Sequence, residues 1–232
     1  MTLPPRTGPR LERKRLIDPR QVSDLISFLE SRYHPDPHAS DPEDPKILID
    51  TLYLDTPGYA SIPGGNGIQL PKHRLRRYDG EGDIWIEEKL RRGDRVWKRR
   101  IPIPEIDLDP VLVGGEPLSG FAEGFRTRFR VLDLKPTLWV TYQRRAFVGA
   151  EGERITIDES ARAAIADVNG NGFSPTVPAV DISTEAILEL KGPLEVEKQL
   201  DLIDEKVVAR GRRFSKYRRG LDLLGLIDSG RS

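Results

Sequence analysis

Short runs of this chain carry a charged side chain at every second residue, and most of these charges are positive. Side chains two residues apart on a β-strand share one face, so each run would give one face of a strand to charge. Because like charges repel across a sheet, strands of this kind indicate a strongly anionic ligand between them. In chain order the runs are Arg10-Leu11-Glu12-Arg13-Lys14, Lys72-His73-Arg74-Leu75-Arg76, Glu87-Glu88-Lys89, Lys98-Arg99-Arg100, Tyr142-Gln143-Arg144, Arg154-Ile155-Thr156-Ile157-Asp158 and Glu189-Leu190-Lys191.

The types of these side chains favour phosphate as the anion. Arginine offers a planar fork of donors that matches phosphate oxygens, and lysine adds a compact point charge. Burying an unpaired cation costs several kcal/mol, so a buried cationic surface persists only if it stays wet or holds a polyanion. The runs therefore indicate a ligand with several phosphates.

Acidic side chains occupy the same faces as the cations, at Glu12, Glu87, Asp158 and Glu189. A carboxylate among cations can form a structural ion pair, or it can bind a divalent ion together with phosphate. The sequence leaves both roles open for each acid, although Glu87 stands two residues from Lys89, which favours an ion pair there.

Overall composition excludes several classes of function but does not identify the ligand. The 232 residues include 37 basic and 37 acidic side chains, so net charge gives no argument for nucleic acid or membrane binding. Aromatic residues make up only 7%, which disfavours stacking on single-stranded nucleic acid. The absence of cysteine excludes disulfides, zinc–thiolate sites and thiol nucleophiles.

The length fits one substantial domain, and we predict a single domain over residues 10–226. A proline-rich leader (1–9) precedes this domain, and a short tail (227–232) follows it. No stretch approaches the roughly 20 apolar residues that a spanning helix needs, so we expect a soluble, cytoplasmic protein.

Hydrophobic spacing and turn residues predict helices near both ends of the chain and strands between them. The pair Asp18-Pro19 predicts the start of one helix, and Gly192-Pro193 predicts the start of another. Two more helices are predicted over 121–132 and about 214–226. Strands are predicted over 10–14, 47–56, three runs between 69 and 103, 138–148, 153–158 and 186–191.

Alternating charge by itself also fits a half-exposed sheet whose polar face lies in water. The residues between the charges at Ile155, Ile157, Leu188 and Leu190 are apolar, however, and the amphipathic helices need an apolar surface to cover. We therefore predict an α+β fold, mainly antiparallel, in which eight strands close into a barrel with helices outside and charges inside. His73 alternates with the charges of its strand, so we expect it at the surface.

In this order, the charged runs and the segment Phe214-Ser215-Lys216-Tyr217 resemble the VTC domain. This domain is the polyphosphate polymerase module of the vacuolar transporter chaperone complex, within the triphosphate tunnel metalloenzyme superfamily. The resemblance covers the chain from about Arg10 to Leu224, and its specificity lies in the order of the motifs rather than in any one of them.

The resemblance implies a tunnel in which cations hold ATP and a growing polyphosphate, and in which the γ-phosphate of ATP passes to the chain end. It also implies a Mn²⁺ or Mg²⁺ ion near the acid of the last tunnel strand. The side chains implied in transfer are Lys14, Arg74, Arg76, Lys98, Arg144, Arg154 and Glu189. Those implied in substrate binding are Arg10, Lys72, Lys89, Arg100, Tyr142, Lys191 and Lys216, with a structural role as the alternative for Tyr142. The candidate metal ligands are Glu189, Glu12 and Asp158.

Two other functions stay open. A triphosphatase or adenylate cyclase of the same superfamily is similar, but those relatives carry a Glu-x-Glu-x-Lys pattern near the N-terminus. Here Arg10 stands at the first acid position, which favours the polymerase branch. A module that binds polyphosphate or nucleotide without catalysis would keep the same cations. The eukaryotic complexes add a phosphate-sensing domain and a membrane segment that are not found here, so we expect this chain to act alone or with a separate protein partner.

Overall fold

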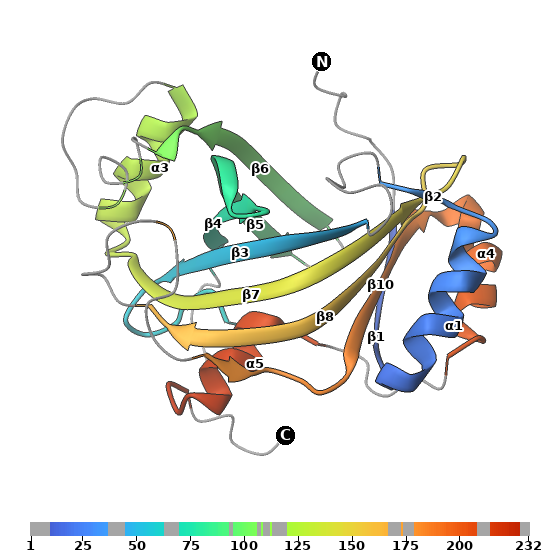
Figure 1. The fold of residues 1–232 in the computed structure, drawn as a ribbon. Coiled ribbons are helices and arrows are strands. Elements are labelled where there is room, and N and C mark those ends of the chain that lie inside the picture. The colour runs from blue at the N-terminus through green and yellow to red at the C-terminus, as the bar shows by residue number, and fades with distance from the viewer. Residues whose placement is uncertain are drawn as a thin grey trace. The chain divides into compact units, whose positions relative to one another are not determined.

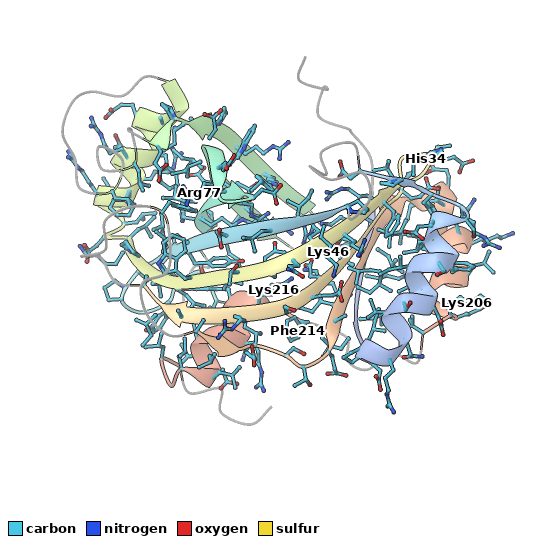
Figure 2. The ribbon with its side chains drawn as sticks, in the orientation of Figure 1. His34, Lys46, Arg77, Lys206, Phe214 and Lys216 are labelled. Atoms are coloured by element: carbon cyan, nitrogen blue, oxygen red, sulfur yellow. The ribbon has the colours of Figure 1, made fainter. Side chains whose placement is uncertain are left out.

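The computed structural model of this chain describes residues 10–36, 45–62, 70–92, 95–105, 108, 112, 120–166, 173, 179–207 and 214–227. The predicted leader (1–9) and residues 228–232 of the predicted tail lie outside the described residues. Side chains are drawn over the ribbon in Figure 2.

Antiparallel strands and a few helices make up the described chain (Figure 1), as the sequence predicted. The strands are β1 (Arg10–Ile17), β2 (His34–Pro35), β3 (Lys46–Asp55), β4 (Lys72–Tyr78), β5 (Glu81–Arg92), β6 (Arg95–Ile103), β7 (Lys135–Val148), β8 (Arg154–Ile165), β9 (Val180–Asp181) and β10 (Ala186–Pro193). The helices are α1 (Pro19–Glu30), α3 (Gly120–Val131), α4 (Glu197–Asp204) and α5 (Lys216–Leu223), with a 3₁₀ turn, η2 (Leu194–Val196), before α4.

Helix boundaries follow from local capping. The Asp18 carboxylate accepts a hydrogen bond from the backbone N–H of Arg20 at 2.9 Å, which caps α1 at the predicted position. Helix α5 is shorter than predicted because Gly225 adopts φ 69°, and the N–H of Leu226 reaches back to the carbonyl of Leu221 at 2.8 Å.

The strand order in the sheet is β1-β10-β8-β7-β3-β4-β5-β6, with the two-residue strands β2 and β9 paired to β7 and β8. Eight strands therefore lie on the main path, as predicted. Among the described strands this path begins at β1 and ends at β6 without returning, so the prediction of a closed barrel is wrong. The number of strands alone does not determine whether the first and the last of them pair.

The chain divides into two compact units. Unit 1 contains Met1–Ile47, Tyr142–Ala161 and Ser183–Ser215, and unit 2 contains Leu48–Thr141, Arg162–Ile182 and Lys216–Ser232. Of the helices in the described part of the chain, none has the length and apolar character needed to cross a membrane.

In unit 1, helices α1 and α4 cover the apolar face of the strands, and both lie on one side of β1 and β10 in Figure 1. Ile155 and Ile157 of β8 and Leu188 and Leu190 of β10 are all fully buried in this core. The prediction that these apolar residues pack under the helices is confirmed.

Two cations of β1 also lie on this helix-covered face. Arg13 donates to Glu197 at 3.0 Å, and Arg15 donates to Asp204 at 2.6 Å, with both carboxylates on α4. Lys14, between them, points to the opposite face. Arg13 and Arg15 therefore bind the covering helix, whereas Lys14 lies on the other face of the strand.

In unit 2, α3 covers the apolar face of β4, β5 and β6, where Leu75, Ile86 and Phe125 are fully buried. His73 lies on this same face, only 1% exposed, with its ring 5.8 Å from that of Phe125. The prediction that His73 is a surface residue is wrong, because its face is the one that the helix covers.

Helix α5 is fixed to unit 2 by a buried carboxylate. Asp55 at the end of β3 accepts hydrogen bonds from the hydroxyls of Tyr217 at 2.8 Å and Ser61 at 2.6 Å. The same carboxylate accepts from the backbone N–H groups of Thr56 and Ser61. Because Asp55 is buried and fully engaged, it acts as a structural anchor rather than as a ligand for substrate.

The burial of the apolar face can be tested with two matched substitutions in unit 1. Leu188→Ala removes a fully buried side chain and should lower the free energy of unfolding by about 2–5 kcal/mol. Leu202→Ala removes a side chain that is 56% exposed and should change it by less than about 0.5 kcal/mol. Urea unfolding of both variants measures the difference, and equal losses would contradict the assignment of the faces.

Candidate functional site

The charged face of unit 2 is built by strands β3, β4, β5 and β6. Arg74 of β4 lies opposite Tyr53 of β3 on one side and Glu87 of β5 on the other. Glu87 in turn lies opposite Arg100 of β6. The strands are antiparallel, and successive side chains of a strand point to opposite faces of the sheet. Arg76, two residues after Arg74, therefore lies on the same face, opposite Thr51.

Glu87 is the centre of this face. Its carboxylate lies 2.5 Å from Nη2 of Arg74, 3.8 Å from Nη1 of Arg76 and 2.8 Å from Nζ of Lys98. Arg76 also donates from Nε to the hydroxyl of Thr51 at 3.2 Å. Glu87 is fully buried and Arg76 is 6% exposed, whereas the side chains of Arg74 and Lys98 are 18% and 41% exposed.

Electrostatics on this face follow from burial and from the excess of cations. Burial alone would raise the pKa of Glu87, but Arg74, Arg76 and Lys98 together lower it far below its usual value. Burial and the neighbouring arginines lower the pKa of Lys98 to about 8, although Glu87 acts in the opposite direction. Three cations thus share one carboxylate, which leaves the group with positive charge.

The other predicted substrate contacts in unit 2 lie around this centre. Lys72 has its ammonium 5.9 Å from the ring centre of Tyr217. Arg100 is exposed, with its guanidinium 4.7 Å from the ring centre of Trp85. Lys89 lies opposite Lys98 in the β5–β6 register, on the same face. Lys216 is the first residue of α5 and is labelled in Figure 2.

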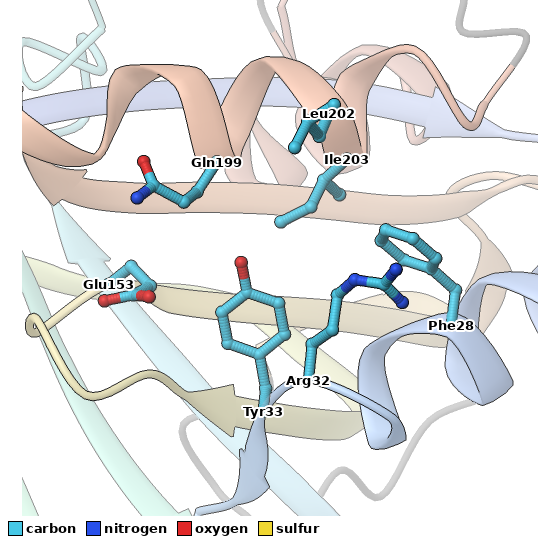
Figure 3. Close-up of a pocket in the computed structure, with 7 residues that line it drawn as sticks. All are labelled: Phe28, Arg32, Tyr33, Glu153, Gln199, Leu202 and Ile203. Atoms are coloured by element: carbon cyan, nitrogen blue, oxygen red, sulfur yellow. The ribbon is translucent and has the colours of Figure 1, made fainter.

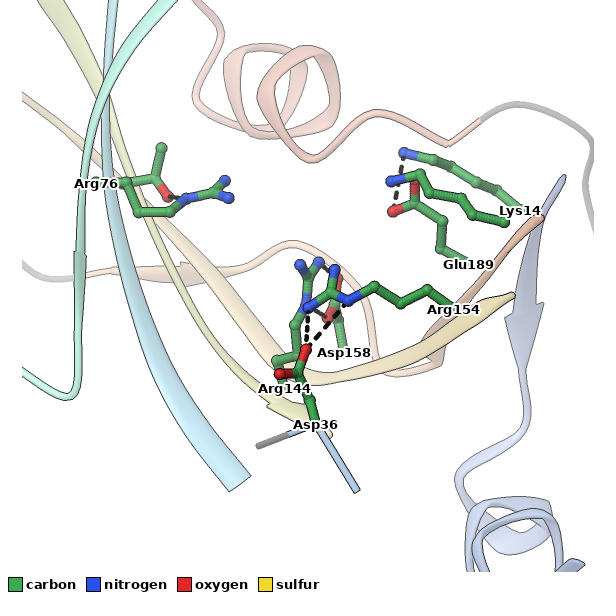
Figure 4. Close-up of polar contacts among 9 residues, drawn as sticks. Lys14, Asp36, Arg76, Arg144, Arg154, Asp158 and Glu189 are labelled. Carbon is green, nitrogen blue, oxygen red and sulfur yellow. Dashed lines mark hydrogen bonds and ion pairs between the residues drawn. The ribbon is translucent and has the colours of Figure 1, made fainter. Parts of the chain in front are cut away.

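The charged face of unit 1 is built by β1, β10 and β8. Glu189 of β10 lies between Lys14 of β1 and Thr156 of β8. Its carboxylate is 3.6 Å from Nζ of Lys14 and 2.5 Å from Nζ of Lys191, and Figure 4 shows these contacts. Burial would raise the pKa of Glu189, but the two ammonium groups hold it well below its usual range.

Two arginines of unit 1 are also paired with acids (Figure 4). Arg144 donates from Nε and Nη2 to the two oxygens of Asp158, at 2.6 and 2.8 Å. Arg154 donates to Asp36 at 2.8 and 3.2 Å. Burial would lower the pKa of Arg144, but Asp158 raises it well above the usual value, so this side chain stays a cation.

Tyr142 is buried, and its ring centre lies 5.2 Å from the guanidinium carbon of Arg144. Arg10 belongs to β1, but its side chain lies outside the described part of the structure. The predicted site residues thus form two charged clusters, one in each unit.

A pocket of about 270 Å³ lies elsewhere in unit 1, between α1 and α4 (Figure 3). Its walls include Phe28, Tyr33, Gln199 and Ile203. Because it lies on the helical side of the strands, it holds none of the predicted phosphate contacts.

Comparison with known proteins identifies the family. No curated protein matches the sequence, but the sequence pattern of the VTC domain matches residues 9–225. The chain belongs to the VTC domain family. The match includes residues of both units, and it agrees with the extent of the resemblance in the sequence.

Solved structures share the fold of this VTC domain. A candidate adenylate cyclase from Bacillus halodurans is 14% identical with a TM-score of 0.57, over 91% of this chain and 97% of that one. The Hippeastrum protein HpAC1, named as an adenylyl cyclase with a dominant triphosphatase activity, is 15% identical with a TM-score of 0.54, over 93% and 96%. At such identities the likeness shows the fold alone.

The acids of unit 1 differ in their suitability as metal ligands in this VTC domain. Within the described residues, no group of three or more histidine, aspartate or glutamate side chains could hold a metal ion by itself. Glu12 and Glu189 both lie within 4 Å of Nζ of Lys14, at 3.9 and 3.6 Å, so the position that the two carboxylates share is held by an ammonium group. Two carboxylates with phosphate oxygens and water would suit Mg²⁺ or Mn²⁺. Asp158 has both of its oxygens engaged by Arg144, and Glu189 has one oxygen facing Lys14 and the other facing Lys191.

The sequence predicted which strand faces carry the cations but not several of the carboxylates that bind them. It paired Glu87 with Lys89, whereas Arg74, Arg76 and Lys98 surround that carboxylate. It gave no role to Asp36, although Asp36 is buried and binds Arg154. These pairings depend on strand register and loop path, which alternation alone does not determine.

The central role of Glu87 predicts a specific loss of stability. Glu87→Gln leaves three cations without their carboxylate and should lower the free energy of unfolding by about 3–5 kcal/mol near neutral pH. Because the pKa of Glu87 is lower in the folded than in the unfolded chain, this contribution is present above about pH 4.3 and is lost as the pH falls further. Urea unfolding at about pH 7 and about pH 3.5 should show the difference between wild type and variant shrinking.

Glu105→Gln is the matched control for Glu87→Gln. Glu105 binds Arg77 at 3.0 Å, but its side chain is 53% exposed. Removing this surface pair should cost at most about 1 kcal/mol at either pH. A loss in Glu87→Gln that is no larger than in this control would contradict a central role for Glu87.

Proposed function

We propose that this VTC domain is a metal-dependent polyphosphate polymerase that transfers the γ-phosphate of ATP to the end of a polyphosphate chain and releases ADP. The observation that carries the proposal is the cluster in which Arg74, Arg76 and Lys98 share the single buried carboxylate of Glu87. Such a cluster is preorganised and short of negative charge. A ligand with several phosphates supplies that charge at the required density.

The transfer requires little covalent chemistry from the protein's own side chains. An ionised phosphate at the chain end is already a nucleophile, so it needs no general base. Arginine and lysine side chains orient the donor and acceptor phosphates and neutralise the charge that builds up on the transferring group. A divalent ion held by Glu189 and Glu12 would add charge neutralisation on phosphate oxygens when bound.

The remaining predicted residues take supporting roles in this proposal. Lys14, Lys191, Arg144 and Arg154 bind phosphate from unit 1. Lys72, Lys89, Arg100 and Lys216 extend the cationic surface of unit 2, and Tyr142 orients Arg144. ATP as the donor fits a cytoplasmic location.

A triphosphatase is the second candidate, because the Hippeastrum protein with this fold has a dominant triphosphatase activity. Purified protein incubated with ATP and Mn²⁺ separates the two functions. Long polymer together with ADP supports the polymerase, whereas orthophosphate or tripolyphosphate without polymer supports the hydrolase. Tight polyphosphate binding with no turnover would show a binding module instead.

Substitutions on opposite faces of β1 test where the reaction takes place. Lys14→Ala removes a cation beside Glu189 and should reduce polymer formation at least about tenfold, since a charge-assisted contact contributes roughly 1.5–3 kcal/mol. Arg15→Ala removes a cation from the helix-covered face of the same strand, so its activity should stay near that of wild type. Polymer yield at equal amounts of folded protein is the measurement, and equal activities of the two variants would contradict the assignment.

The lowered pKa of Lys98 predicts a pH dependence of binding. Its ammonium form predominates below about pH 8, so the affinity for tripolyphosphate should fall as the pH rises through that value. Lys98→Arg should weaken this dependence, because arginine keeps its charge. Isothermal titration of both proteins from about pH 7 to about pH 9 gives the result, and identical profiles would exclude Lys98 as a phosphate contact.

A further inference from the structure

Tyr53 lies on the charged face of unit 2, although neither its sequence position nor the family resemblance gave it a role. It is directly opposite Arg74 in the β3–β4 register, and Thr51, two residues earlier, is opposite Arg76. Tyr53 and the two arginines therefore project from the same face of neighbouring strands. Asp55, two residues later on the same face, is bound by the hydroxyl of Tyr217.

The ring of Tyr53 is held firmly in place. It is only 8% exposed, and it stacks on the ring of Tyr217 with centres 4.5 Å apart and planes inclined by 22°. Tyr217 is itself fixed by its hydrogen bond to Asp55. A side chain that is already ordered loses little entropy when it forms a further contact. The stacking thus presents the Tyr53 hydroxyl in one position.

We propose that the Tyr53 hydroxyl is a further substrate contact, which donates a hydrogen bond to the phosphate group bound by Arg74 and Arg76. This inference rests on the proposed function, because it assumes that these arginines bind phosphate. A protonated phenol suits the task, since phosphate oxygens only accept and the two arginines already supply the positive charge.

The surroundings of Tyr53 make its protonation sensitive to bound phosphate. Burial raises the pKa of the phenol, but Arg74, Arg76 and Lys72 outweigh this effect and lower it to about 8. Glu87 faces the phenol from β5 beyond Arg74, and Tyr217, bound to Asp55, faces it from α5. Phosphate on the arginines would cancel their field and favour the protonated phenol, so its pKa should rise on binding.

The experiment is a spectroscopic pH titration of the full chain, with tripolyphosphate as the probe and no metal added. Phenolate absorbance of wild type should show one tyrosine that ionises near pH 8, and a saturating amount of tripolyphosphate should move this ionisation to higher pH. Tyr53→Phe should lose this ionisation and bind tripolyphosphate about tenfold more weakly near neutral pH. Tyr78→Phe, at the end of β4, is the control and should keep both properties.

The outcomes separate this inference from the proposed function. Tripolyphosphate that binds wild type and Tyr53→Phe equally, with no movement of the phenol titration, overturns the role of Tyr53 and leaves the phosphate-binding function in place. A wild type that does not bind tripolyphosphate overturns the proposed function as well. If Tyr53→Phe does not fold, the wild-type titration with and without tripolyphosphate still decides the question.

Discussion

Clustered cations that outnumber their carboxylate partner among the described residues are the constraint on which the rest of this structure depends. Arg74, Arg76 and Lys98 share Glu87, and the registers of β4, β5 and β6 place all four on one face. The opposite face of these strands is apolar and covered by α3. A one-residue shift in register would therefore bury the charged side chains in the core. The cations must therefore stay together, although mutual repulsion makes this costly unless an anion is present.

In unit 1, the face of β1 on which a cation lies determines which carboxylates it binds. Arg13 and Arg15, on the helix-covered face of β1, are matched by carboxylates of α4 and hold that helix on the sheet. Lys14, between them, faces the acid of β10 and shares it with Lys191. Adjacent residues of β1 thus divide into cations that bind the covering helix and a cation that faces the carboxylates of Glu12 and Glu189.

The sequence predicts the strands, the helices and the division between charged and apolar faces, because each depends on short-range periodicity. It does not predict which carboxylate meets which cation. Glu87 and Arg74 are 13 residues apart and meet only through register, and Asp36 reaches Arg154 from the end of the short β2–β7 pairing, where its N–H binds the carbonyl of Ala146. The prediction of a closed barrel was wrong for a similar reason, because the number of strands does not determine whether the first and the last of them pair.

The carboxylates within these clusters have a role of their own in a polymerase. A cationic face without carboxylates would bind polyphosphate very tightly. The product, which has the same chemistry as the acceptor, would then not be released. Glu87 and Glu189 stay ionised at neutral pH and remain beside the cations. In the proposed polymerase, Lys98 and Lys14 would therefore not be left unpaired when a phosphate leaves, which would lower the barrier to release. The same acids make the empty site stable enough to fold, so one set of ion pairs serves both the fold and the turnover proposed for it.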